Sequence, residues 1–326
     1  MHKYALVFFV YNSSFSYYFG SRMERDKQIK DNKNIYALFK ETALYQGYID
    51  RSQKGLFIII LFSFLFSACV SQSVMKTVAN DIAKESNLQP IFIRTSTFSL
   101  QGYYRFHNSG APLTVYIEGD GLAYLHRNTP SANPTPRNPL ALRLAGIDRG
   151  ENVLYLARPC QYVNFKSERL CKTSYWTHKR FSKEVILAVN EAIDKMVPKG
   201  KVDGIHLVGY SGGGAVAALV AASRRDVLSL RTLAGYMDHV ILNRKKDVSP
   251  LKGSLDPIKA APRLKSVPQI HYSGIKDKVI PKWVAKKFAH AVGNKNCASV
   301  RLINATHARG WEKAWKKVWF NVPVCR

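Results

Sequence analysis

Ser211 lies in a stretch whose residue types and spacing suit a nucleophile. It is the centre of a Gly-x-Ser-x-Gly pattern, between an apolar run over 205–208 and an alanine-rich run over 215–222. The first run predicts a buried strand and the second a helix, which places the serine on a sharp turn between them. Small neighbours permit that strained turn, and the helix N-terminus favours negative charge beside the hydroxyl. We therefore expect a nucleophilic serine rather than an idle one in a glycine-rich turn.

The elements around this turn alternate between strands and helices. Such alternation predicts the α/β class, with a mostly parallel sheet and helices on both faces. Two long connections, 122–139 and 235–262, are expected to frame a pocket. Strands are predicted over 91–94, 100–106, 113–117, 152–156, 205–208, 227–233, 269–273 and 299–303, and helices over 139–145, 181–196, 215–222, 282–292 and 308–320.

Three titratable side chains follow predicted strands. His307 comes directly after the last strand. An imidazole titrates near neutrality, so it can take the proton of a serine hydroxyl and return it to a leaving group. Asp277 follows the strand over 269–273, and Asp238 follows the strand before that one. Either carboxylate could hold the imidazole in the required tautomer.

The order of the elements and motifs resembles the α/β-hydrolase fold, and the resemblance covers nearly all of residues 90–326. Catalytic groups of that fold lie on loops at the carboxyl ends of strands, in the order serine, acid, histidine. The resemblance implies that Ser211 is the nucleophile and His307 the base. The segment from Gly274 to Pro281 resembles the family's Gly-x-x-Asp-x-x-Val/Ile-Pro acid loop, which implies Asp277 as the acid. Asp238 is the alternative, because some members place their acid after the preceding strand.

The resemblance also implies an oxyanion hole formed by two backbone N–H groups. Gly212, directly after the nucleophile, would supply one, and Asp120 or Gly121 in the loop after the third predicted strand would supply the other. Family members often carry His-Gly in that loop, where this chain has Glu118 and Asp120. Two carboxylates beside an oxyanion oppose its formation unless they are turned away or paired, and Arg158 is one possible partner.

The N-terminal part of the chain indicates export. Lys54 precedes a short apolar run over 55–66 and then Ser67, Ala68 and Cys69. A basic flank, an apolar core and small residues are typical of a secretory signal. The small pair before the cysteine resembles a bacterial lipoprotein lipobox, which implies cleavage before Cys69 and attachment of lipid to its sulfur. The alternative is an uncleaved membrane anchor.

These features predict four regions. Residues 1–50 are expected to be an upstream mis-start or a disordered extension, 51–69 a lipoprotein signal peptide, 70–89 a tether and 90–326 the hydrolase domain. Within 70–86 the tether is expected to be followed by a short helix. By resemblance to lipoprotein sorting in Gram-negative bacteria, Val70 after the lipid cysteine favours the outer membrane, facing the periplasm, over the inner membrane.

The cysteine count agrees with an oxidising compartment. If Cys69 carries lipid, four cysteines remain, an even number that can pair in the periplasm. Local spacing favours Cys160 with Cys171 and Cys297 with Cys325, although three pairings are possible. None of the four lies in a Cys-x-x-Cys pattern, so no metal site is predicted.

The chain is strongly basic, with 49 Lys and Arg residues against 22 Asp and Glu and a formal net charge of +27. The basic residues cluster over 244–246, 276–287 and 313–317. Such clusters could attract anionic lipid or envelope polymers. The alternative is a general lysine bias on a solvated surface. Nucleic acid is not expected as a partner, because an exported lipoprotein rarely meets it.

Together the motifs predict a serine hydrolase anchored by lipid in the bacterial envelope. Its substrate would be a small-molecule or lipid carboxylic ester or thioester, cleaved through an acyl-enzyme without a cofactor. Motifs at 118–121, 158–160 and 175–176 resemble those of a group of bacterial α/β-hydrolase proteins, many of them exported. Two alternatives stay open: a non-catalytic lipoprotein that binds anionic envelope components, and a peptidase of the same fold. The connection over 235–262 is short for the cap domain that such a peptidase usually needs.

Overall fold

The computed structural model describes residues 74–165, 167–197 and 202–326. The predicted extension, signal peptide and lipidated Cys69 lie outside these residues. The described residues form one compact unit. Its main strands are β1 (Gln89–Arg94), β2 (Ser99–Phe106), β3 (Leu113–Ile117), β6 (Asn152–Leu156), β7 (Ile205–Tyr210), β8 (Val227–Leu233), β9 (Gln269–Gly274) and β10 (Ala298–Ile303).

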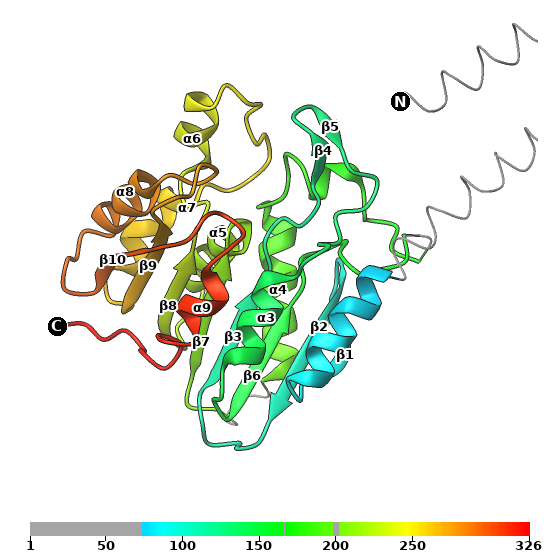
Figure 1. Ribbon diagram of the computed structural model, residues 1–326, viewed down its shortest axis with the longest axis horizontal. Coiled ribbons are helices and arrows are strands. Elements are labelled where there is room, and N and C mark those ends of the chain that lie inside the picture. Colours follow the sequence, from blue (N-terminus) through cyan, green and yellow to red (C-terminus); the bar gives the residue numbers. More distant parts are fainter. Residues whose placement is uncertain (1–73, 166, 198–201) are drawn as a thin grey trace, which may run out of the picture. The chain divides into compact units, whose positions relative to one another are not determined.

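These strands form one eight-stranded sheet in the order β1-β2-β6-β3-β7-β8-β9-β10 (Figure 1). Strand β2 pairs antiparallel with both β1 and β6, and every pair from β6 to β10 is parallel. The mostly parallel sheet predicted from the alternation of elements is thus confirmed. Because β3, β7, β8, β9 and β10 are parallel, their carboxyl ends meet at one edge.

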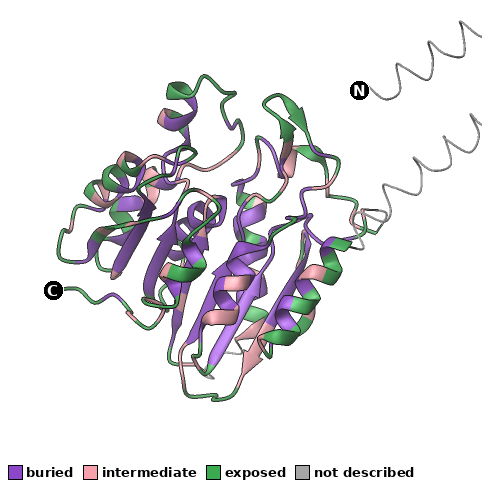
Figure 2. Ribbon diagram, viewed as in Figure 1, coloured by how far each residue is buried: buried purple, intermediate pink, exposed green. Residues whose placement is uncertain are grey.

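Helices cover both faces of the sheet, as predicted, and the sheet between them is buried (Figure 2). A helix over residues 74–85, α3 (Leu140–Ile147) and α9 (Trp311–Trp315) lie on one face. On the other face are α4 (Lys183–Met196), α5 (Gly212–Ala221) and α8 (Lys282–Val292). Every residue of α5 is buried, so its run of small side chains lets the helix approach the sheet closely.

The two ends of the domain differ in how well they were predicted. The short helix expected after the tether, within 70–86, is a packed helix over 74–85, in which Ala79 and Ala83 are buried and Asn80 accepts a hydrogen bond from Tyr103 at 2.7 Å. The domain therefore begins well before residue 90. The last helix, expected over 308–320, is only Trp311–Trp315, and the chain then continues through hydrogen-bonded turns.

The two long connections carry short elements of their own. The connection after β3 contains a hairpin of β4 (Tyr124–His126) and β5 (Thr129–Pro130). The connection after β8 contains α6 (His239–Lys245) and α7 (Pro257–Ala260). The hairpin and α6 project beyond the same end of the sheet (Figure 1).

Two disulfides fasten the connections. They join Cys160 with Cys171 and Cys297 with Cys325, the pairing that local spacing favours. The first closes the loop that follows β6, and the second ties the C-terminal segment to the start of β10. Within the described ranges, no helix has both the length and the apolar character needed to cross a membrane.

Candidate active site

Ser211 lies on a strained turn between β7 and α5, with a backbone φ of +51°. The turn brings backbones so close together that side chains cannot fit. A Cβ on Gly209 would lie 2.3 Å from the carbonyl oxygen of Gly213, and a Cβ on Gly213 would lie 2.2 Å from that of Ile117. The glycines of the motif are therefore steric requirements of the elbow, and the positive φ aims the hydroxyl away from the sheet.

His307 connects Ser211 to Asp277. Its Nε2 lies 3.1 Å from Ser211 Oγ, and its Nδ1 lies 2.9 Å from Asp277 Oδ2. An ionised carboxylate can only accept hydrogen bonds, so Nδ1 carries the proton and the lone pair of Nε2 faces the serine hydroxyl. This is the protonation state in which a histidine can act as a base toward serine.

Asp277 is held in its ionised form. Burial by itself would raise the pKa of this carboxyl, but the hydrogen bond and charge of His307 and the backbone N–H groups of Ile280 and Val279 lower it below its usual value. Those two N–H groups donate to Oδ1 at 2.9 and 2.8 Å. The acid loop thus fixes one carboxylate oxygen with main chain and leaves the other for the imidazole.

The backbone of His307 is fixed as well. Its carbonyl oxygen accepts hydrogen bonds from Tyr210 Oη at 3.0 Å and from Trp311 Nε1 at 2.8 Å. Sequence analysis missed both residues. Their positions were the only signal: Tyr210 directly precedes the serine, and Trp311 follows the histidine by one helical turn.

Asp238, the alternative acid, is engaged elsewhere. It is the N-cap of α6, where its carboxylate accepts a hydrogen bond from the backbone N–H of Ile241 at 3.1 Å. Its other oxygen is paired with Lys287. Of the two candidate acids, the structure brings only Asp277 to His307.

The carboxylate of Asp120 forms ion pairs with two buried arginines. Oδ2 lies 2.6 Å from Arg180 Nη1, and Oδ1 lies 3.2 Å from Arg158 Nη1. Burial would raise the pKa of Asp120, but the charges and hydrogen bonds of Arg180 and then Arg158 outweigh burial and lower it. The carboxylate lies against the start of α5, since a Cβ on Gly212 would meet Oδ1 at 2.0 Å. The negative charge beside the elbow is therefore paired, which removes the difficulty raised by the sequence.

Arg180 was not anticipated. It follows Asp120 by 60 residues, and no local pattern marks it. Its guanidinium is held by a hydrogen bond from Nε to the carbonyl of Thr177 at 2.6 Å. Its backbone is held as well, because Arg158 donates to the carbonyl of Arg180. The two arginines and Asp120 thus form one connected cluster.

The main chain of the loop from Gly119 to Gly121 is also fixed. Gln161 Nε2 donates to the carbonyl of Gly119 at 3.0 Å, and a Cβ on Gly121, whose φ is +62°, would lie 2.1 Å from Pro134 O. In the part of the chain that the structure describes, no hydrogen bond uses the N–H of Asp120 or of Gly121. The N–H of Gly212 is the first of α5 and has no acceptor within that helix.

Glu118 is turned away from the elbow. Its carboxylate accepts hydrogen bonds from Gly119 N at 2.9 Å, from Ala141 N at 3.4 Å and from Tyr155 Oη at 3.2 Å, so it faces the start of α3. Burial outweighs these donors and raises the pKa of Glu118 to about 7. The carboxylates of Glu118 and Asp120, whose charge would oppose a neighbouring oxyanion, thus both have partners of their own.

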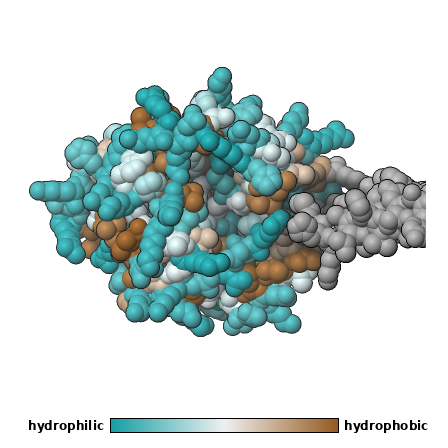
Figure 3. Space-filling view, turned by 45° about the horizontal axis from the view of Figure 1, so that its top comes forward, coloured by the Kyte–Doolittle hydropathy of each residue, from teal (hydrophilic) through white to brown (hydrophobic). Residues whose placement is uncertain are grey.

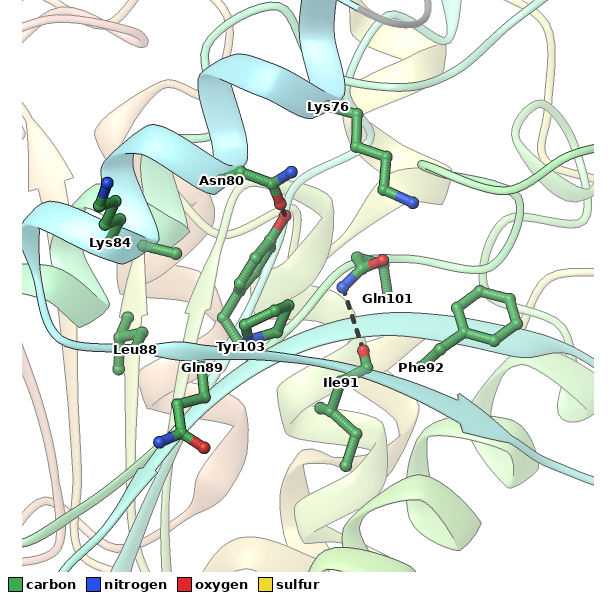
Figure 4. A pocket seen from close by; sticks show the side chains of 11 residues that line it. Lys76, Asn80, Lys84, Leu88, Gln89, Ile91, Phe92, Gln101 and Tyr103 are labelled. Carbon is green, nitrogen blue, oxygen red and sulfur yellow. Dashed lines mark hydrogen bonds between the residues drawn. The ribbon is translucent and has the colours of Figure 1, made fainter.

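A groove of about 630 Å³ lies at the far edge of the sheet, between the helix over 74–85 and β1. Lys76, Lys84, Phe92 and Tyr103 are among its lining side chains (Figure 4). Three strands separate β1 from β7, which ends at Ser211. This groove is therefore separate from the candidate active site.

No protein-family model and no curated protein sequence match the chain, but solved structures do. Est1E from Butyrivibrio proteoclasticus matches with a TM-score of 0.50 and 15% identity, over 72% of this chain and 98% of its own. A membrane phospholipase A matches with a TM-score of 0.51 and 15% identity, over 83% and 97%. An acylaminoacyl peptidase from Pyrococcus horikoshii matches with a TM-score of 0.51 and 14% identity, over 70% of this chain and 39% of its own.

These similar structures are serine hydrolases of the α/β-hydrolase fold, so the fold predicted from the sequence is confirmed. This chain spans well under half the length of the peptidase. At identities this low the likeness concerns the fold, and it assigns no substrate.

Proposed function

We propose that the protein is a serine hydrolase that cleaves a carboxylic ester or thioester through an acyl-enzyme. One observation carries the proposal: the two hydrogen bonds that connect Ser211, His307 and Asp277. They join side chains from the loops after β7, β10 and β9, at the edge of a parallel sheet where such folds place their chemistry. The solved esterase and phospholipase A of the same fold support it.

In the first half of the reaction, Ser211 Oγ attacks the acyl carbonyl carbon while His307 Nε2 takes the hydroxyl proton. The resulting imidazolium is stabilised by the ionised Asp277. The tetrahedral intermediate collapses, the bond to the leaving oxygen or sulfur breaks, and His307 returns its proton to that leaving group. In the second half, water attacks the acyl-enzyme by the same proton transfers and releases the acid.

The oxyanion of each tetrahedral intermediate would be held by the N–H groups of Gly212 and Asp120. The cluster of Asp120, Arg158 and Arg180 supports this assignment, because it holds the Asp120 carboxylate in place and leaves the backbone N–H available. Two arginines against one carboxylate also leave net positive charge close to the oxyanion. Gly121 is the alternative donor.

The test is covalent labelling with a fluorophosphonate probe. A folded preparation should be labelled at Ser211, and His307→Ala should suppress the labelling because the serine then lacks its base. Absence of labelling on folded protein would refute the hydrolase proposal.

A peptidase is the second candidate, because the acylaminoacyl peptidase has the same fold. We favour ester or thioester substrates, since the connection after β8 holds the short helices α6 and α7 and a 3-10 helix (Ala261–Leu264), which together are too small for a cap domain. A matched pair of substrates with one acyl group, one an ester and the other an anilide, separates the candidates. Faster turnover of the anilide would favour the peptidase.

We further propose that Cys69 carries lipid and anchors the domain in the outer membrane of a bacterial envelope, facing the periplasm. The signal-like segment before Cys69 and the two disulfides support export. Replacement of Cys69 by serine should release the protein from the membrane fraction and remove the mass of the lipid. Unchanged fractionation and mass would refute the anchor.

A further inference from the structure

Three loops beside the active site join into a rim. Arg127 of the β4–β5 hairpin donates to the carbonyl of Lys246 at 3.3 Å and pairs with Asp247 at 3.1 Å, just after α6. Lys246 Nζ donates to the carbonyl of Lys278, in the acid loop, at 2.9 Å. The hairpin, the end of α6 and the acid loop are therefore linked side by side, at the edge of the sheet that carries Ser211.

The rim is basic. Its exposed cations come from all three loops, whereas Asp247 is the exposed acid of these segments and is already paired with Arg127. Asp277, the other acid of the rim segments, is buried against His307. The exposed basic side chains are Arg127, Arg244, Lys245, Lys246, Lys276 and Lys278.

Apolar side chains are exposed between these charges. They lie on the hairpin, on or just after α6 and on the acid loop, and they are between 38% and 59% exposed, so apolar and basic side chains alternate on one rim. They are Leu125, Val240, Val248, Ile275 and Val279. Figure 3, turned so that the top of Figure 1 comes forward, shows apolar patches among mainly hydrophilic side chains.

We propose that this rim docks on the surface of a lipid bilayer that contains anionic lipids, so that the esters cleaved at Ser211 are those of membrane lipids. Cationic side chains would meet the headgroup phosphates while the interleaved apolar side chains enter the acyl boundary. A soluble polyanion would use the charges alone and leave the exposed leucine, isoleucine and valine side chains in water. The statement about substrates depends on the proposed hydrolase function, whereas the docking itself does not.

Docking is tested by co-sedimentation of the chain from Val70 onwards, which lacks the proposed anchor and retains the compact unit. The vesicles are phosphatidylcholine alone or phosphatidylcholine mixed with phosphatidylglycerol. Binding is expected only to the mixed vesicles. The double variant Arg244→Gln/Lys245→Gln should bind them about ten- to thirtyfold more weakly, as expected for two basic residues at an anionic surface.

The matched control is Arg263→Gln/Lys265→Gln. Both residues are exposed, and they precede β9 at the opposite edge of the sheet. The control changes the net charge equally and should bind the mixed vesicles like the parent. Equal losses in both double variants, or no loss in either, would overturn the proposal.

The apolar side chains are tested separately. Leu125→Ser/Val248→Ser should weaken vesicle binding severalfold, whereas Leu187→Ser/Leu228→Ser, at exposed positions outside the rim, should not. If the rim apolar variant binds like the parent and heparin displaces the protein from vesicles equally in both, the site recognises a soluble polyanion and the proposal fails.

Activity distinguishes failure of docking from failure of the proposed function. The rim variants should lose turnover of a vesicle-borne phospholipid ester by the same factor as binding and keep their turnover of a short, soluble ester. Ser211→Ala should bind vesicles like the parent. If neither the parent nor the rim variants cleave the soluble ester, the hydrolase proposal fails, whereas the docking proposal is still decided by the vesicle-binding measurement.

Discussion

Asp277 and Asp120 are the same residue type in equivalent places, each in the loop that follows a parallel strand, yet the protein uses opposite parts of them. Asp277 fixes its carboxylate with main-chain N–H groups and offers one oxygen to His307. Asp120 gives its carboxylate to Arg180 and Arg158, and its backbone N–H, which has no acceptor among the described residues, is the donor proposed for the oxyanion. What surrounds a carboxylate, rather than its presence in a catalytic loop, therefore decides what it can do.

The largest effect is expected for Asp277→Asn. An asparagine amide can donate to Nδ1 and favour the wrong imidazole tautomer, so kcat on a soluble ester should fall about 10⁴-fold. Asp238→Asn is the control and should change kcat less than about tenfold, since Asp238 contacts Lys287 and the start of α6. The reverse ranking would transfer the acid's role to Asp238.

A smaller loss of kcat is expected when one of the two arginines that pair with Asp120 is replaced. Arg180→Gln should lower kcat about 10²-fold with little change in KM, because an oxyanion hole acts on the transition state. Arg180→Lys keeps the charge and should recover part of the loss.

The control is Arg224→Gln. Arg224 also pairs with two carboxylates, those of Asp194 and Asp226, but far along the chain from the oxyanion loop. Its replacement should leave kcat within about twofold. If both arginine variants lose kcat equally, or if Arg180→Gln changes only KM, the cluster does not position the oxyanion loop.

Glu118 contrasts with Asp120 two residues away and should affect stability rather than turnover. Burial raises its pKa from 4.5 to about 7, so between these pH values the folded protein holds a proton that the unfolded chain has released. Stability must then fall as pH rises across this range, by up to about 3 kcal/mol. Glu118→Gln should abolish this fall, measured by urea unfolding at pH 5 and pH 8; an unchanged difference between the two pH values would contradict the assignment.

The smallest change in kcat is expected from removal of a disulfide, and only one of the two disulfides should cause it. Cys160 lies beside Arg158 and Gln161, so Cys160→Ser/Cys171→Ser should loosen the oxyanion loop and lower kcat by at most about tenfold. The Cys297–Cys325 bridge ties the C-terminal segment to the start of β10 and does not hold the oxyanion loop. The double variant Cys297→Ser/Cys325→Ser should therefore leave kcat unchanged in protein that is still folded. Equal losses of kcat at a temperature well below both unfolding transitions would show that the first bridge has no special role.

Much of the fold could be predicted from local patterns. Alternating apolar runs predicted the strands of the sheet, and the helix over 282–292 begins and ends where expected. The last helix was predicted to be longer than it is. Its five residues are held by the buried side chains of Trp311 and Trp315. The residues after Trp315 have helix-forming side chains but do not continue the helix. The short helix expected within 70–86 is present over 74–85. Its weak periodicity gave no sign of the buried residues Ala79 and Ala83, by which it packs on the sheet.

The sequence by itself determined the elbow around Ser211, the acid loop of Asp277 and the position of His307 after the last strand, because each depends on a short motif and on its place next to a strand. Only the tertiary structure decided which carboxylate reaches His307 and how Asp120 is neutralised. Arg180 and Asp120 are 60 residues apart. In the basic rim, Arg127 contacts Lys246 across 119 residues and Lys246 contacts Lys278 across 32. Such contacts depend on how strands are ordered in the sheet, which no local pattern contains.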